Sequence, residues 1–290
     1  MQAAPVGDQA RLGAVHLRVT DLDRLVAVWR DVIGLEIIRV HGQSVELGHA
    51  AQVLLVLHSG ASSPVRGPSV GLFHVAIEVP TRDGLAQVAN RMVHSGLTSV
   101  GQDHLVTHSI YLTDPDGMDI EVLLSTPDRG RIEIAGGFPR ALPADGSAHN
   151  GREAFDIQAL AEEARGRPPT YGARMHHLHL RSRAPERLLQ FYCDVVGFLP
   201  FVNAPAIGMF DVGTAVSPHV LAFNNWGGPA IRERVEGSAG LMSFEIVVPS
   251  GEHLAALQAR LSANNALIES GAGTLYEDPD GNFFRVSVAA

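Results

Sequence analysis

Hydrophobic and polar residues alternate in four short segments, which begin near Ala14, Leu72, Met175 and Leu241. Strict alternation over a few residues predicts a strand with one buried face, whereas apolar residues three or four apart predict an amphipathic helix. Each alternating segment is followed by a helical pattern and then by further strand-like runs. The pattern therefore predicts four units, each made of a strand, a helix and three more strands.

The boundaries of these units follow from capping and turn residues. In the first unit a helix is predicted over 22–32, because Asp21 or Thr20 can cap its start and Gly34 follows its end. The strands that come after it are predicted at 35–40, 44–47 and 52–57. The second unit has the same plan, with its helix over 82–94.

An internal repeat supports this division. The stretch 16–34 aligns with the stretch 179–197, and each runs from a His to a Gly. Asp-Pro-Asp-Gly occurs at 114–117 and again at 278–281, each time before an apolar run that is typical of a strand. The two halves of the chain thus share one plan, and each half contains two of the units, or modules.

The two halves are separated by a segment that Pro and Gly residues interrupt repeatedly. Within it, residues 155–164 have helical spacing after Asp156, a capping residue, and predict one short helix. We therefore expect an N-terminal domain over 10–125, a linker over 126–174 and a C-terminal domain over 175–290.

Composition narrows the function classes. The net charge is −9, which argues against nucleic acid or an anionic membrane surface as the main partner, because both select basic patches. Neither a signal peptide nor a membrane-spanning apolar run is evident, and the one cysteine, Cys193, fits a reducing compartment. We expect a cytoplasmic protein with a small-molecule ligand, and 14 histidines raise the question of a metal site.

Two features resemble motifs of the vicinal oxygen chelate superfamily: a His in the opening strand, and Asp-Pro-Asp-Gly-x-x-x-Glu, whose Glu lies in the last strand. This superfamily includes glyoxalase I, fosfomycin-resistance proteins and extradiol catechol dioxygenases. The resemblance implies an α+β fold in which four βαβββ modules pair into two cup-shaped domains. It also implies a metal ion inside a cup, bound by one side chain from each opening strand and by one or two from the last strands.

His16, His74 and Glu121 stand at these module positions in the first half. Each alone is as well explained as a buried core histidine or an exposed strand residue. Together, two imidazoles and a carboxylate are typical of non-heme Fe(II) oxygenases, because they leave open positions for substrate and dioxygen. We predict one metal site formed by these three residues, in the N-terminal domain.

The second half serves as a comparison. His179 matches His16, but Ser243 and Arg285 stand where His74 and Glu121 stand in the first half. Serine is a poor ligand and a guanidinium repels a cation, so the C-terminal domain is predicted to be degenerate and metal-free. The neighbouring His176 and His177 cannot both face the cup, because adjacent strand residues point to opposite faces.

The four-module chain particularly resembles two-domain extradiol catechol 2,3-dioxygenases that keep their metal in the N-terminal domain. Three further residues match this group: His58 ends the first module, His104 precedes the final hairpin, and Tyr111 lies ten residues before Glu121. The resemblance implies that they are catalytic, with Fe(II), or alternatively Mn(II), as the metal. Each also has a plain structural explanation, as a surface, loop or packing residue.

The resemblance further implies that a catechol and O₂ are the substrates, in the catabolism of aromatic compounds, and that the chain forms a homo-oligomer. His58 would accept a catechol proton and return it, while Tyr111 and His104 would hydrogen-bond the bound oxygens. Leu105, Thr107 and His108 replace Gly, Ser and Glu of the related group, so the preferred ring substituents stay open.

Two other functions use the same kind of cup. A glyoxalase-type lyase or isomerase also needs the metal, but usually adds a second carboxylate as base or ligand. A binding protein of the bleomycin-resistance type holds its ligand without a metal, and three intact ligand positions argue against it.

Overall fold

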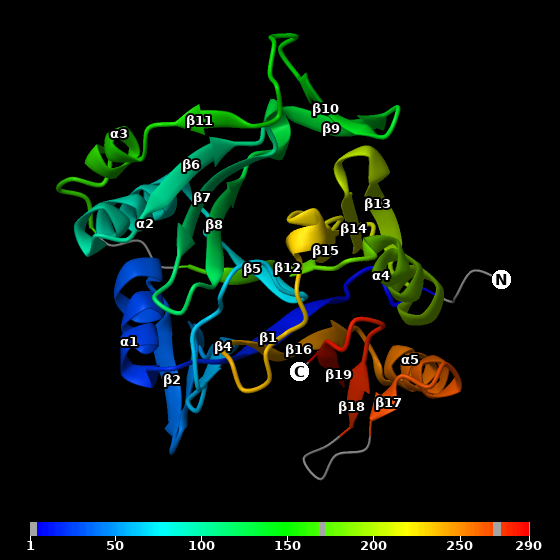
Figure 1. Ribbon diagram of the computed structural model, residues 1–290. Helices are drawn as coiled ribbons and strands as arrows, with labels where there is room; N and C mark the ends of the chain where they lie inside the picture. Colours follow the sequence, from blue (N-terminus) through cyan, green and yellow to red (C-terminus); the bar gives the residue numbers. More distant parts are fainter. Residues whose placement is uncertain (1–4, 169–171, 269–273, 290) are drawn as a thin grey trace.

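Four βαβββ modules make up the chain in a computed structural model that describes residues 5–168, 172–268 and 274–289 (Figure 1). Module 1 contains β1 (Arg11–Arg18), α1 (Leu22–Ala27), η1 (Val28–Ile33), β2 (Glu36–His41), β3 (Ser44–His49) and β4 (Gln52–His58). Module 2 contains β5 (Gly71–Glu78), α2 (Arg82–Ser95), β6 (Ser99–Asp103), β7 (Thr107–Thr113) and β8 (Asp119–Ser125). Both modules have the element order predicted from the alternation of apolar and polar residues.

The second half repeats this order. Module 3 contains β12 (Arg174–Arg181), α4 (Pro185–Phe191), η3 (Tyr192–Val196), β13 (Leu199–Ala204), β14 (Met209–Gly213) and β15 (Leu221–Asn224). Module 4 contains β16 (Gly240–Val248), α5 (Gly251–Ala263), β17 (Leu267–Ile268), β18 (Leu275–Glu277) and β19 (Phe283–Val288). Short 3₁₀ turns, η4 (Pro205–Ile207) and η5 (Gly228–Ala230), lie in its loops. The α+β fold of four modules is confirmed.

The linker is more structured than its Pro and Gly content indicates. It holds η2 (Pro127–Arg129), β9 (Gly130–Ala135), β10 (Phe138–Pro143), β11 (Glu153–Phe155) and α3 (Ile157–Glu162). The short helix begins after Asp156 as predicted, because this carboxylate accepts the N–H groups of Gln158 and Ala159. The β9–β10 hairpin reaches β13 of module 3, so the linker contacts both halves of the chain (Figure 1).

The modules do not pair in sequence order. One sheet has the order β17-β18-β19-β16-β1-β4-β3-β2 and so joins module 4 to module 1. The other has the order β11-β6-β7-β8-β5-β12-β15-β14-β13 and joins module 2 to module 3. The junctions are antiparallel pairs, β1 with β16 and β5 with β12. The sheets therefore do not coincide with the expected domains, 10–125 and 175–290.

This difference has a simple physical reason. The opening strands of the modules share one alternation, and a module-opening strand offers the same edge to any of the others. Pairing of β1 with β5 and pairing of β1 with β16 therefore satisfy the same backbone groups. The choice between them depends on how loops and linker route the chain, which the repeat pattern does not encode.

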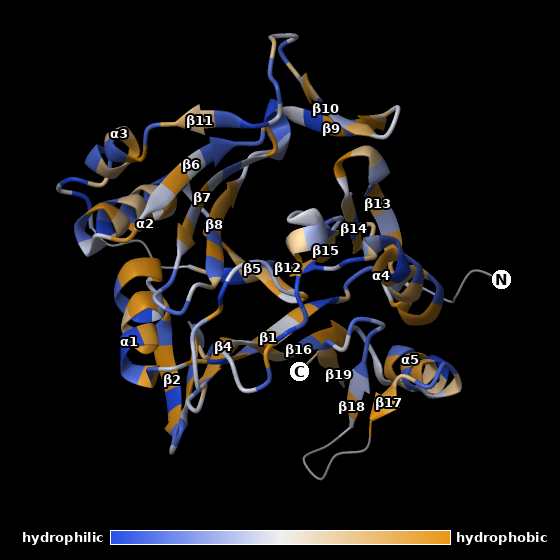
Figure 2. Cartoon of the chain, viewed as in Figure 1, coloured by the Kyte–Doolittle hydropathy of each residue, from blue (hydrophilic) through white to orange (hydrophobic). Residues whose placement is uncertain are grey.

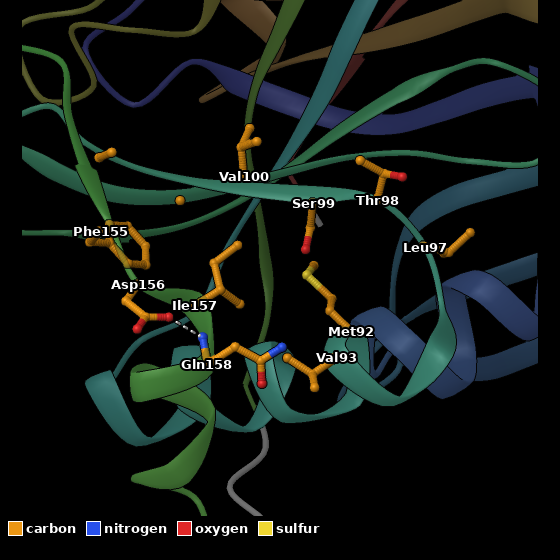
Figure 3. A pocket seen from close by; sticks show the side chains of 12 residues that line it. Met92, Val93, Leu97, Thr98, Ser99, Val100, Phe155, Asp156, Ile157 and Gln158 are labelled. Atoms are coloured by element: carbon orange, nitrogen blue, oxygen red, sulfur yellow. Dashed lines mark hydrogen bonds between the residues drawn. The ribbon is translucent and has the colours of Figure 1, made fainter.

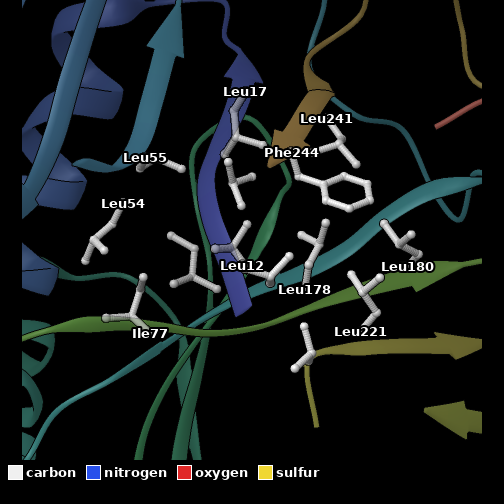
Figure 4. Packing of buried hydrophobic residues seen from close by; sticks show 14 of the residues in the cluster. Leu12, Leu17, Leu54, Leu55, Ile77, Leu178, Leu180, Leu221, Leu241 and Phe244 are labelled. Carbon is white, nitrogen blue, oxygen red and sulfur yellow. The ribbon is translucent and has the colours of Figure 1, made fainter. Parts of the chain in front are cut away.

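The two sheets pack against each other through β1 and β16 on one side and β5 and β12 on the other. Their inward residues, among them Leu17, Ile77, Leu180 and Phe244, form one hydrophobic cluster (Figure 4). Hydrophobic and hydrophilic residues alternate along the strands in Figure 2, as expected for strands with one face in a core. The opposite face of each sheet is thus free to carry polar groups. Within the described residues, no helix is long and apolar enough to cross a membrane.

The ends of the first helices repeat closely in modules 1 and 3. Each helix loosens into a π-helical turn, η1 or η3, and stops at a glycine in the left-handed region, Gly34 (φ 99°) or Gly197 (φ 96°). A guanidinium from the following module then binds the free carbonyls of that turn. Arg91 of α2 donates to Val32 and Ile33, and Arg260 of α5 donates to Val195 and Val196, all at 2.8–2.9 Å.

The two Asp-Pro-Asp-Gly turns are also alike. Asp114 Oδ1 accepts the backbone N–H groups of Asp116 and Met118, each at 2.9 Å, and Asp278 does the same in module 4. Burial raises the pKa of Asp114 to about 7 and that of Asp278 to about 6. The Oδ2 atom of Asp278 accepts the hydroxyl of Tyr192, whereas the buried Oδ2 of Asp114 has no hydrogen-bond partner in the described part of the chain.

Asp114 should make the protein less stable as the pH rises. The folded state keeps a proton on this carboxyl up to about pH 7, whereas the unfolded chain loses it near 3.8, so the stabilisation present at low pH is lost across this range. Asp114→Asn cannot lose a proton. Its free energy of unfolding relative to wild type should therefore increase by up to about 1.4 kcal/mol per pH unit, measured by urea denaturation between about pH 5 and pH 7.

Asp145→Asn, at an exposed position in the linker, is the matched control and should show no such increase. A difference between Asp114→Asn and wild type that stays constant with pH contradicts the assignment.

Candidate metal and active site

Three side chains meet on the outward face of the module 2–module 3 sheet. His74 of β5, Glu121 of β8 and His177 of β12 are all at most 4% exposed. The two Nε2 atoms of His74 and His177 are 2.9 Å apart, and Glu121 Oε2 lies 3.1 Å from the first and 3.3 Å from the second. Two imidazole nitrogens and one carboxylate oxygen thus converge from three adjacent strands, an arrangement that suits a divalent metal ion.

Strand alternation explains this convergence. On β5 and β12 the core residues Val75 and Leu178 point inward, so His74 and His177 point outward. Glu121 lies opposite Ala76 in the parallel β5–β8 pair and shares that outward face. The order β8-β5-β12 therefore places one ligand on each of three neighbouring strands.

The protonation states favour metal binding. Burial, followed by the nearby His219, holds the pKa of His177 well below its usual value, so this imidazole is neutral. Burial alone would raise the pKa of Glu121, but hydrogen bonds and charge interactions with His177 and His74 outweigh burial and lower it well below the usual value. A neutral imidazole and an ionised carboxylate are the forms that bind a metal, so the donor set fits such an ion.

Further histidines surround these three ligands. His179 also offers a nitrogen within 4.8 Å of ligand atoms of His74 and His177, but its Nε2 is held by the Asn224 amide at 2.8 Å. His176 Nδ1 lies 2.8 Å from His177 Nδ1, so the other ring nitrogen of His177, Nε2, faces His74 and Glu121. Such outer contacts fix the orientation of a ligating imidazole.

His219 and Asp211 form a dyad beside the triad. The His219 ring centroid lies 4.2 Å from that of His177, and His219 Nδ1 lies 2.5 Å from a carboxylate oxygen of the buried Asp211. Burial lowers the pKa of His219, but the charge of Asp211 and this hydrogen bond outweigh burial and raise it. An imidazole oriented by a carboxylate is suited to proton transfer.

Tyr111 and His104 extend the network on the other side. The Tyr111 hydroxyl donates to Glu121 Oε1 at 2.8 Å, and His104 Nε2 lies 3.1 Å from the same hydroxyl. His104 Nδ1 lies 2.9 Å from the Gly151 carbonyl, so Nδ1 carries a proton. Burial and the charge of Glu121 raise the pKa of Tyr111 well above its usual value, and its hydroxyl stays protonated.

The structure brings together four of the six predicted site residues. His74 and Glu121 lie in the triad, and His104 and Tyr111 adjoin it. His16 does not, because β1 belongs to the other sheet, and there its Nδ1 lies 2.9 Å from His58 Nε2. The predicted metal ligand His16 and the predicted catalytic His58 are therefore corrected: pairing of β1 with β16 takes both away from His74.

His177 was noted in the sequence but not chosen as a ligand. The alignment that matches His16 with His179 also matches Ala14 with His177, so the first module has no side chain that could reveal the position. The C-terminal half was predicted to hold no metal ligand. The position of His177 on β12, beside His74 and Glu121, argues against that expectation.

His16 shares the module 1–module 4 sheet with Ser243 and Arg285, the two residues that replace metal ligands in the second half. Ser243 lies opposite His16 in the β1–β16 pair, and Glu245 lies beside Arg285 in the β16–β19 pair. Burial, His58 and then Arg285 lower the pKa of His16 to about 4, with Glu245 acting in the opposite sense. In the described part of this sheet, no group of three metal-ligating side chains converges.

One pocket lies apart from the triad. It has a volume of about 520 Å³ and lies between α2, β6 and the linker segment of β11 and α3, where Met92, Val93, Phe155 and Ile157 supply an apolar lining (Figure 3). The carboxylate of Asp156 is engaged in capping α3. None of its lining residues belongs to the triad, so the candidate chemistry lies elsewhere.

Residues 11–122 match the model of the Glyoxalase/Bleomycin resistance protein/Dioxygenase superfamily. The matched residues are those of modules 1 and 2. A catechol-2,3-dioxygenase of Bacillus subtilis (strain 168) is 26% identical over 256 residues, which cover 86% of each chain. This superfamily is the one that the repeated modules and the Asp-Pro-Asp-Gly motif resemble.

Two solved structures have a similar fold. A putative dioxygenase from Bacillus subtilis subsp. subtilis str. 168 superposes with a TM-score of 0.61 at 10% identity, covering 99% of this chain and 86% of that one. Glyoxalase I from Zea mays superposes with a TM-score of 0.59 at 16% identity, covering 96% and 92%. Both likenesses concern the fold and leave the reaction of this chain open.

Metal binding should depend on His177 and not on His16. His177→Ala and Glu121→Ala each remove one of three converging donors, so their affinity for Fe(II), measured anaerobically by titration calorimetry, should fall at least tenfold. His16→Ala is the matched control and should bind like wild type. Loss of binding in His16→Ala, with retention in His177→Ala, contradicts the triad.

Proposed function

We propose that this protein is an extradiol ring-cleaving dioxygenase, which opens a catechol next to its two hydroxyl groups with O₂. The observation that carries this proposal is the convergence of His74, His177 and Glu121 within 3.3 Å, with Tyr111 and His104 attached to it. The match to a catechol-2,3-dioxygenase over most of both chains supports the same reaction.

Fe(II) is the cofactor that the donor set suits best. His74, His177 and Glu121 would hold it through Nε2, Nε2 and Oε2, a set of two neutral nitrogens and one anionic oxygen. When bound, the iron would supply adjacent open positions for the two catechol oxygens and for O₂. Mn(II) accepts the same donors, and metal analysis of the purified protein distinguishes the two.

The chain's own residues control the protons of the reaction. His219 donates Nδ1–H to Asp211, so its Nε2 is available to accept a proton from a catechol hydroxyl and to return it later. This dyad takes the role that the sequence suggested for His58. Tyr111 keeps its proton and donates a hydrogen bond to Glu121, and with His104 beside its hydroxyl it would orient that carboxylate next to the bound substrate oxygens.

Aromatic side chains line the same face and favour a planar ring. The Phe73 ring lies 4.8 Å from that of His179 and 5.4 Å from that of Trp226, measured between centroids. Apolar walls of this kind exclude water from the reacting groups and orient a catechol by stacking or edge contact.

Ring cleavage should depend on Tyr111 and not on His58. Tyr111→Phe leaves all three metal donors in place but removes the hydroxyl between Glu121 and His104, so kcat with catechol should fall about 10²- to 10⁴-fold at unchanged iron content. His58→Gln, in the other sheet, should keep wild-type turnover. The measurements are O₂ uptake, the yellow ring-opened product and iron content.

The rival functions give different results in the same assay. No O₂ uptake with any catechol, together with turnover of a glutathione hemithioacetal, would refute the proposal in favour of a glyoxalase-type enzyme. Tight binding of a ligand by metal-free protein, without turnover of any of these compounds, would indicate a sequestering protein instead.

A further inference from the structure

A smaller pocket, of about 250 Å³, lies beside the triad at the end of the same sheet. It is lined by ends of β5, β8 and β12, by residues 65 and 67–70 of a loop, and by Ala239 and the start of β16. Its charged lining residues are two arginines, Arg181 and Arg234, and one acid, Asp119. The Asp119 carboxylate already accepts the Thr113 hydroxyl at 2.7 Å. The pocket is thus positively charged in a chain whose net charge is −9.

Arg181 has a buried donor atom without an acceptor. Within the described residues its Nε atom has no hydrogen-bond partner, and Asp119 acts on the guanidinium by its charge but forms no ion pair with it. The guanidinium carbon stacks over Phe73, 4.8 Å from the ring centroid. Buried polar groups are almost always hydrogen-bonded, and an unpaired cationic one is especially costly, so this group calls for an anionic partner from outside the chain.

Arg234 reinforces the same site. Its guanidinium donates only to neutral oxygens, those of Leu241, Gly281 and Asn282, each at 3.2 Å. No carboxylate of the described residues forms an ion pair with it, although the charges of nearby acids, Asp278 foremost, act on it. Two guanidiniums without an ion-pair partner in one small pocket match a carboxylate, which accepts paired hydrogen bonds from arginine.

The pocket is close enough to the triad to hold one end of a bound substrate. Arg181 is two residues beyond His179 on β12, and Asp119 lies two residues before Glu121 on β8. Residues two apart on a strand are about 7 Å apart and point the same way. Phe73, which lines the pocket, also contacts the rings of His74 and His179. A catechol ring at the triad with a short side chain spans that distance.

From this arrangement we infer that the preferred substrates are catechols with a short anionic side chain, whose carboxylate is bound by Arg181 and Arg234. This inference rests on the proposed dioxygenase function and adds the substrate class. Arg181 acts as a specificity determinant, and the stacked Phe73 ring separates the carboxylate from the reacting oxygens.

The first test compares substrates. Wild-type enzyme should show a kcat/KM at least tenfold higher for a dihydroxyphenylacetate, with the diol at ring positions 3,4 or 2,3, than for the corresponding methylcatechol. Arg181→Met keeps a long side chain on Phe73 without the charge, so this preference should disappear while methylcatechol turnover is retained. Arg181→Lys should keep part of it, because the charge remains but the paired hydrogen bonds do not.

Arg66→Met is the matched control, because Arg66 is exposed between the pocket residues Val65 and Gly67 but does not line the pocket. It removes the same charge from the rim and should leave the preference unchanged. Equal preference in wild type and Arg181→Met, or equal loss in Arg66→Met, overturns the inference.

The second test needs neither metal nor turnover. Phenylacetate should bind chelator-treated wild-type protein at least tenfold more tightly than it binds Arg181→Met, measured by titration calorimetry, with Arg66→Met like wild type. Absent binding, or binding that Arg181→Met leaves intact, overturns the pocket assignment. Absence of O₂ uptake with every catechol overturns the proposed function instead, and the calorimetric result then judges the anion pocket by itself.

Discussion

Antiparallel backbone hydrogen bonds between β5 and β12 hold His74 and His177 on one face of one sheet. Because side-chain direction alternates along a strand, the same register that buries Val75 and Leu178 turns both imidazoles outward. A shift of the register by one residue would place the histidines in the core and the apolar side chains on the outward face. Burial of the apolar side chains therefore fixes the register. The candidate metal centre therefore depends on core packing beneath it as much as on its own polar contacts.

Helices and strands connect the modules in two different ways. Arg91 joins module 2 to the helix end of module 1, and Arg260 joins module 4 to that of module 3, following the order of the chain. The sheets join module 1 to module 4 and module 2 to module 3. Each module thus contacts one partner through its helix and another through its opening strand, and this accounts for a single hydrophobic cluster shared by all four.

Local patterns predicted what depends on neighbouring residues. Capping by Asp156, the glycine ends at Gly34 and Gly197 and the Asp-Pro-Asp-Gly turns are short-range effects, and the structure has them where the sequence indicates. His74, Glu121, His104 and Tyr111 lie within one module, and the resemblance to extradiol dioxygenases implied their grouping. Whether β1 or β12 lies beside β5, and so whether His16 or His177 comes near His74, is a long-range choice between the edges of opening strands.

Since β5 and β12 come from opposite halves of the chain, the triad is divided between two segments that meet only when the linker brings them together. The linker, expected over 126–174, therefore sets the effective concentration at which one half-site meets the other. Cutting it would make assembly of the centre a second-order reaction. The same strand edges would also allow two chains to exchange halves, and each would complete the other's metal site.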